Sequence, residues 1–188
     1  MTLSATLKWL FYLALTAFFV RISVLLVYKM ENQFMSPSLP ANSILIGSKW
    51  SYGIRFPWSE SAYFESFPQV NDIVALEFKN QPGLVFVKRI LAGPGDRVKV
   101  EKNELFINQK KCDYLPVNSP SEKAEIIETC EAYSITISQF TKDINYPERL
   151  LVDGEYFALY DNREFEGDLA QFSIITFNQV LGKIYFHF

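Results

Sequence analysis

Histidine and cysteine are scarce in this chain of 188 residues, and each scarcity removes a class of mechanism. The one histidine, His187, is next to the last residue, which argues against a Ser-His-Asp triad and against a histidine-rich metal site. The two cysteines, Cys112 and Cys130, do not form a C-x-x-C redox motif. We therefore predict neither a metal nor a cofactor for this protein.

Lysine and arginine (18) are fewer than aspartate and glutamate (21), so the formal net charge is −3. A negative net charge argues against nucleic acid as the main partner. Residues 1–30 contain Lys8, Arg21 and Lys29 and no acid, so they carry +3 and the rest of the chain carries −6. A basic, apolar leader joined to an acidic body predicts two parts. These are an N-terminal anchor, residues 1–30, and a domain, residues 31–188, that is long enough to bury a core.

The segment Trp9–Tyr28 is apolar except for Thr16, Arg21 and Ser23. Twenty helical residues extend roughly 30 Å, about the thickness of a hydrocarbon core, so we predict one membrane-spanning helix and a lipid bilayer as partner. A cleavable signal peptide is the alternative, but no A-x-A cleavage site follows the apolar run. Arg21 lies either near the interface of a tilted helix or against another membrane protein.

The body is predicted to be mainly β, because short apolar or alternating runs are separated by glycine, proline and asparagine turns. The chain shows no internal repeat. We expect a hairpin turn at Lys102-Asn103. Strands are expected within residues 44–46, 72–78, 84–91, 97–101, 104–108, 126–140, 155–160 and 179–188.

Cys112 and Cys130 enclose 17 residues in an acidic domain that follows a predicted anchor. This favours a disulfide in an oxidising compartment, which would contribute about 3 kcal/mol by the chain-entropy estimate. Two cysteines are also an ordinary number for a reduced protein, so both states stay open.

Lys88 stands in the otherwise apolar run Leu84–Leu91, and in a strand either Lys88 or Arg89 faces the apolar side. Burial disfavours the charged form of a lysine, which allows it to take a proton from a hydroxyl nucleophile. The alternative is a solvated lysine on an edge strand.

Several ordered blocks resemble the motifs of type I signal peptidases, membrane-anchored serine peptidases with a Ser-Lys dyad. Any one block is weak evidence for the resemblance, whereas the whole set in the same order is strong evidence. The matching blocks are Met35-Ser36-Pro37-Ser38-Leu39, then Lys49, Tyr52, Gly53, Arg55 and Pro57, then Lys88-Arg89, Pro94-Gly95-Asp96, Asp161-Asn162-Arg163 and Gly182-Lys183-Ile184.

The resemblance implies that Lys88 is the general base and that Phe34 occupies the position of the nucleophilic serine. The family's S-G-S is Asn32-Gln33-Phe34 here, so Asn32 takes the place of the serine that helps to stabilise the oxyanion. Ser36 is an alternative nucleophile, which in an extended strand would point to the same face but lie roughly 6–7 Å further along. Ser38 lies further still.

Downstream, Asp161, Asn162, Arg163 and Asp168 match the family pattern that supports the lysine. Glu166 stands where the pattern has a serine, and it would be able to pair with Lys88.

The resemblance further implies a single-pass protein of the cytoplasmic (inner) membrane with an extracytoplasmic domain. Our hypothesis is a catalytically silent homologue that binds precursor peptides, or proteins of secretion, pilus or conjugation-type assembly. In it, the Phe34 ring fills the cleft after loss of the chemistry, excludes peptides, or holds a partner peptide uncut. The alternatives are an active signal or pilin endopeptidase that uses Lys88 with Ser36, and a purely structural anchored β-domain.

Overall fold

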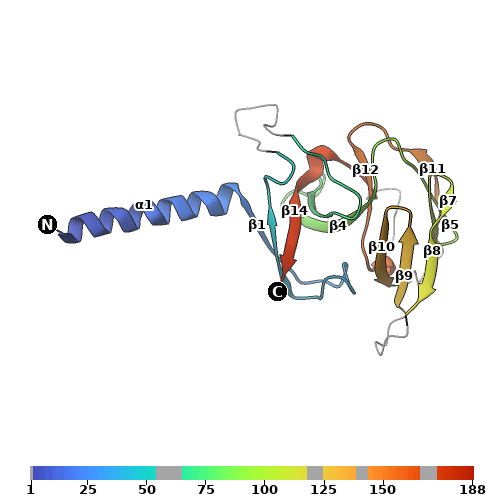
Figure 1. Ribbon diagram of the computed structural model, residues 1–188, viewed down its shortest axis with the longest axis horizontal. Coiled ribbons are helices and arrows are strands. Elements are labelled where there is room, and N and C mark those ends of the chain that lie inside the picture. Colours follow the sequence, from blue (N-terminus) through green and yellow to red (C-terminus); the bar gives the residue numbers. More distant parts are fainter. Residues whose placement is uncertain (1, 54–64, 118–124, 139–143, 166–172) are drawn as a thin grey trace.

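The computed structural model describes residues 2–53, 65–117, 125–138, 144–165 and 173–188. An N-terminal helix, α1 (Thr2–Ser23), projects as a single rod from a body of β-strands, next to β1 and β14 (Figure 1). The prediction of a mainly β body is confirmed.

The largest sheet has seven strands, and each neighbouring pair is antiparallel. It carries Lys88-Arg89 on β4 and Gly182-Lys183-Ile184 on β14. In spatial order the strands are β1 (Leu25–Met30), β2 (Ser43–Ser48), β14 (Val180–His187), β3 (Ile73–Glu77), β4 (Val85–Ala92), β12 (Glu155–Leu159) and β13 (Ile174–Thr176).

Two smaller sheets lie at the end of the body away from α1 (Figure 1). One contains, in order, β11 (Tyr146–Leu150), β5 (Arg97–Glu101), β6 (Glu104–Ile107) and β7 (Lys110–Lys111). The other contains β10 (Tyr133–Ser138), β9 (Glu125–Cys130) and β8 (Asp113–Pro116). Two single-turn 3₁₀ helices, η1 (Arg163–Phe165) and η2 (Phe177–Gln179), follow β12 and β13.

The segment Trp9–Tyr28, predicted to be one membrane-spanning helix, is divided between two elements. The helix ends at Ser23, and Leu25–Met30 pairs with β2 over six residues. Within this strand Leu26 and Met30 are buried while Val27 is exposed, so the apolar run conceals the alternation of a strand. In the described part of the chain, no helix is both long and apolar enough to cross a membrane.

Two hairpins of the body coincide with sequence predictions, and local turn chemistry explains the first. Lys102 and Asn103 connect β5 and β6 with φ angles of 49° and 68°, the left-handed pair that a two-residue hairpin requires. The stretch 126–140, expected as strand, forms most of the hairpin β9–β10, whose register is set by the pair Cys130–Tyr133.

The hydrophobic core joins all three sheets. Its largest cluster combines Leu91 and Phe157 of the large sheet with Val98 of the four-stranded sheet and Ile137 of the three-stranded sheet. Cys112, which precedes β8, belongs to this cluster and forms a disulfide with Cys130 at the end of β9.

Candidate functional site

Lys88 and Arg89 are neighbours in β4, so their side chains leave opposite faces of the strand, and both are buried. Sequence reasoning expected only one of them to face the apolar side. Lys88 is fully buried, and its Nζ lies 4.1 Å from the centre of the Tyr160 ring. An ammonium at this distance is attracted by the face of an aromatic ring.

Arg89 forms a forked ion pair with Asp161 across the neighbouring strands β4 and β12. The Nε atom of Arg89 donates to Asp161 Oδ1 at 2.9 Å, and Nη2 donates to Oδ2 at 2.6 Å. Its remaining nitrogen, Nη1, donates to Asn71 Oδ1 at 2.8 Å. Two parallel bonds fix the guanidinium relative to the carboxylate, so this pair sets where the chain leaves β12.

Asn162 attaches the segment that contains Phe34 to the end of β12. Its backbone N–H donates to the Phe34 carbonyl oxygen at 2.9 Å, and its Nδ2 donates to the Gln33 carbonyl oxygen at 3.0 Å. The Phe34 ring lies 4.8 Å from the Tyr160 ring and 5.0 Å from the Phe165 ring, between centroids. Tyr160 therefore contacts both Phe34 and Lys88, and the two motif positions meet at its ring.

Asn32 and Ser36 belong to turns that flank Phe34. The Asn32 side-chain oxygen accepts the Phe34 N–H at 3.3 Å, an Asx turn, so Asn32 serves here as a local acceptor. The Ser36 N–H donates to the Gln33 carbonyl oxygen at 3.2 Å, and residues 34–38 form a turn. The extended strand that we assumed when placing Ser36 is therefore wrong.

Of the remaining residues of the predicted site, the structure describes Arg163 but not Asp168 or Glu166. Arg163 is fully buried at the start of η1, where its Nη2 donates to Glu128 Oε1 at 2.8 Å. Asp168 and Glu166 lie outside the described residues, as do Arg55, Pro57 and the side chain of Arg21.

A groove of about 200 Å³ opens beside Phe34. Tyr28 and Met30 of β1 form one wall, residues 83–87 form the other, and Asn32 and Phe34 complete the lining. In the described residues β12 pairs with β4 between Arg89 and Ala92, and β3 pairs with β4 between Val85 and Arg89. β1 pairs only with β2 in this part of the chain, so a strand at the edge of the large sheet lines the groove.

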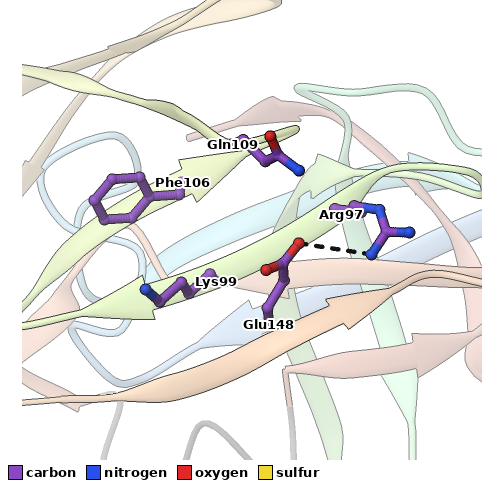
Figure 2. Close-up of a pocket in the computed structure, with 5 residues that line it drawn as sticks. All are labelled: Arg97, Lys99, Phe106, Gln109 and Glu148. Atoms are coloured by element: carbon purple, nitrogen blue, oxygen red, sulfur yellow. Dashed lines mark ion pairs between the residues drawn. The ribbon is translucent and has the colours of Figure 1, made fainter.

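A second hollow, of about 240 Å³, lies on the four-stranded sheet and is lined by charged side chains (Figure 2). Arg97 of β5 and Glu148 of β11 face each other in it, with 3.6 Å between Nη1 and Oε1. Lys99 and Phe106 lie at its other end, 5.6 Å from Nζ to ring centre. Within the residues described, no three His, Cys, Asp or Glu side chains are grouped so as to hold a metal ion.

Sequence reasoning missed three residues of the site, namely Glu128, Tyr160 and Phe165. Glu128 lies at a buried position of β9, but the run Ile126-Ile127-Glu128 does not alternate and so gave no signal. The two aromatic residues flank the Asp161-Asn162-Arg163 block and carried no signal of their own.

Comparison with known proteins assigns the chain to a family. The family described as "Signal peptidase, peptidase S26" matches residues 3–188. The chain belongs to the signal peptidase family.

Two relatives show the extent of the similarity. The chain is 28% identical over 173 residues to Signal peptidase I of Bacillus caldolyticus, which covers 90% of this chain and 82% of that protein. It is 32% identical over 108 residues to Signal peptidase IB of Staphylococcus aureus, covering 55% of this chain and 52% of that protein. A crystal structure of a signal peptidase I from Enterococcus faecalis aligns with a TM-score of 0.38 and 23% identity, over 64% of this chain and 98% of that chain.

Proposed function

We propose that this member of the signal peptidase family binds extended peptides without cleaving them. The observation that carries the proposal is the packing of the Phe34 ring against Tyr160, whose ring also holds the Lys88 ammonium. In the motif register Phe34 takes the position of the nucleophile. A benzyl side chain has no lone pair with which to attack a carbonyl and no proton for Lys88 to remove.

The groove beside Phe34 suits a peptide in extended conformation. A peptide strand would add to β1, which pairs only with β2 in the described part of the chain, and hydrogen-bond there, which is a recurrent mode of peptide recognition. The groove volume of about 200 Å³ favours small side chains, since drug-sized ligands occupy pockets of about 300–1,000 Å³. Precursor segments with small residues at alternate positions are therefore the proposed ligands.

We also propose that the protein acts at a membrane, with its β body in an extracytoplasmic compartment. Large apolar side chains are exposed around α1, and a helix that is apolar on all sides requires an apolar environment. The Cys112–Cys130 disulfide favours an oxidising compartment. The proposed partners are then lipid and precursor or assembly proteins. The exposed side chains of α1 are Leu7, Trp9, Leu10, Phe11, Tyr12, Leu13, Leu15 and Phe18.

An active peptidase is the second candidate function, and the burial of Lys88 next to the groove favours it. The similar proteins of B. caldolyticus and S. aureus are themselves named signal peptidases. In this alternative, a turn rearrangement would bring Ser36 to Lys88.

Cleavage of a precursor with a small-x-small signal sequence separates the two functions. Detergent-purified wild-type protein would be compared with the variants Phe34→Ser, Ser36→Ala and Lys88→Ala. We expect no cleavage by wild type and measurable cleavage by Phe34→Ser that is lost when Lys88→Ala is added. Cleavage by wild type that disappears in Ser36→Ala and in Lys88→Ala would establish the peptidase instead.

Binding is tested with a labelled peptide of the same small-x-small sequence and with its copy N-methylated at the central amides. Strand addition predicts that wild type binds the first peptide and that N-methylation weakens binding about tenfold or more, because two or more backbone hydrogen bonds of about 1 kcal/mol each are lost. Equal affinity for both peptides would rule out the strand-addition mode.

A further inference from the structure

Two charged side chains, one from the three-stranded sheet and one from the turn after β12, are buried together. Glu128 lies in β9 of the three-stranded sheet, Arg163 begins η1 after β12, and both are fully buried. Glu128 Oε1 accepts from Arg163 Nη2 at 2.8 Å and from the Tyr133 hydroxyl at 3.0 Å. A buried ion pair is often no more stabilising than apolar side chains of the same volume. Stability alone therefore does not explain why Glu128 and Arg163 are paired here.

Arg163 connects this ion pair to the ring that carries the site. Its Nη1 donates to the carbonyl oxygen of Tyr160, so one guanidinium bridges Glu128 and the backbone of Tyr160. The Tyr160 ring in turn contacts the Phe34 ring and lies under the Lys88 ammonium. Three contacts therefore lead from β9 to the lining of the groove.

The backbone of the same turn provides a second connection. Ser138 of β10 donates its N–H to the Asp161 carbonyl oxygen at 3.1 Å, and the next residue, Asn162, donates to the carbonyl oxygens of Phe34 and Gln33. The three-stranded sheet thus contacts the turn 160–163 through the Glu128 carboxylate and through the Ser138 backbone.

We infer that Glu128 is a positioning residue, which acts through Arg163 to hold the turn 160–163 in the conformation that shapes the groove at Phe34. Glu128 does not line the groove, so it influences a bound peptide only through this turn. The effect on the groove rests on the proposed peptide-binding function. The effect of Glu128 on the conformational order of residues 160–163 does not depend on a peptide.

Amide hydrogen exchange of Asn162 tests that claim without any peptide. We compare its exchange rate with that of the Ile90 amide in the core strand β4, in wild type, Glu128→Gln and Ile135→Ala. The last variant destabilises the same three-stranded sheet through a buried side chain that belongs to the core cluster. Glu128→Gln keeps an acceptor oxygen but removes the negative charge, so it is expected to raise the Asn162/Ile90 ratio about tenfold, as loss of the charge assistance to the Arg163 hydrogen bond implies, while Ile135→Ala leaves it unchanged. An unchanged ratio in Glu128→Gln overturns the inference.

A double variant keeps the test valid if Glu128→Gln does not fold. Glu128→Met combined with Arg163→Met replaces the ion pair by apolar side chains of similar volume, which usually preserves the fold. The Asn162/Ile90 ratio is expected to rise in this variant as well. A folded double variant with the wild-type ratio would show that packing alone orders the turn.

Peptide affinity completes the experiment. With the labelled small-x-small peptide, Glu128→Gln is expected to bind about tenfold more weakly than wild type, in line with the same lost charge assistance, and Ile135→Ala to bind equally well. Equal affinity of Glu128→Gln and wild type overturns the link to the groove. Absence of binding by wild type itself would refute the proposed function, and the exchange ratio would still decide the role of Glu128.

Discussion

The groove at Phe34 and the hollow of Figure 2 are similar in size, yet they differ in the burial of the charged side chains near them. The groove at Phe34 measures about 200 Å³, and the Tyr160 ring that packs on Phe34 also contacts Lys88, which is fully buried. The hollow of Figure 2 measures about 240 Å³, and its ion pair between Arg97 and Glu148 has side chains that are 51% and 45% exposed.

This difference identifies the groove as the place where geometry is fixed. Exposed ion pairs are worth about 0–1 kcal/mol and allow their side chains to move, so the Figure 2 hollow has no rigid polar frame. Buried charges are tolerated only when each is held by a partner, and such groups hold their neighbours in one arrangement. Of the positions that the signal peptidase motifs mark, Phe34 lines the groove, and the Tyr160 ring links it to Lys88.

The largest effect is expected from Asp161→Ala, which removes the partner of Arg89. The buried guanidinium would lose two hydrogen bonds, and breaking one side of a buried ion pair costs about 3–5 kcal/mol. Urea denaturation would measure the free energy of unfolding. Glu148→Ala makes the matching change in the Figure 2 hollow, and an equal loss in both variants would contradict the comparison.

A smaller effect is expected from Phe34→Ala. Removing a fully buried phenylalanine costs about 3–5 kcal/mol, and because Phe34 is only partly buried we expect about 2 kcal/mol. A double-mutant cycle with Phe165→Ala would isolate the ring contact, expected at about 0.5–1.5 kcal/mol. A coupling energy of zero would mean that the two rings lie together without stabilising each other.

Alkaline pH offers a third test, because burial first, and then the nearby Glu128 carboxylate, raise the pKa of Tyr133 well above its usual value of 10. The neutral phenol is favoured in the folded state, so its contribution is complete below pH 10 and is lost as the pH rises above 10. Tyr133→Phe is expected to make the fall of stability above pH 10 less steep by about 1.4 kcal/mol per pH unit. Tyr185→Phe, at an exposed position, is the control and should leave the slope unchanged.

The smallest effect is expected from Arg97→Ala in the hollow of Figure 2. Loss of its exposed ion pair should change the free energy of unfolding by less than about 1 kcal/mol. The affinity for the small-x-small peptide should equal that of wild type. A tenfold weaker affinity would place part of the binding surface on the four-stranded sheet.

Most strands of the large sheet could be predicted from the sequence. Five of them, β2, β3, β4, β12 and β14, coincide with runs that alternate or are bounded by turn residues. Prediction failed at β1, since an apolar run of leucine and valine reads equally well as helix, and pairing with β2 decides between them. It also missed β11 and β13, which are short and rely on tertiary partners.

At the site, the motifs indicated Lys88, Phe34 and the block from Asp161 to Arg163, but not how they are connected. The connection through Tyr160 depends on where β12 ends and on a ring contact that has no sequence spacing. Glu128 was missed because its partner Arg163 is 35 residues away, and a long-range ion pair leaves no local pattern.

The junction between α1 and β1 has a mechanical consequence. Only Val24 separates the last residue of the helix from the first residue of β1, and β1 supplies Tyr28 and Met30 to the groove wall. A one-residue junction has no slack, unlike a flexible linker, whose reach grows with its length. Met30 is five residues of strand beyond the first residue of β1, about 17 Å. Under the proposed function, a surface that held α1 would also set its distance from the groove, and a peptide would then be bound at the part of its length that passes at this distance.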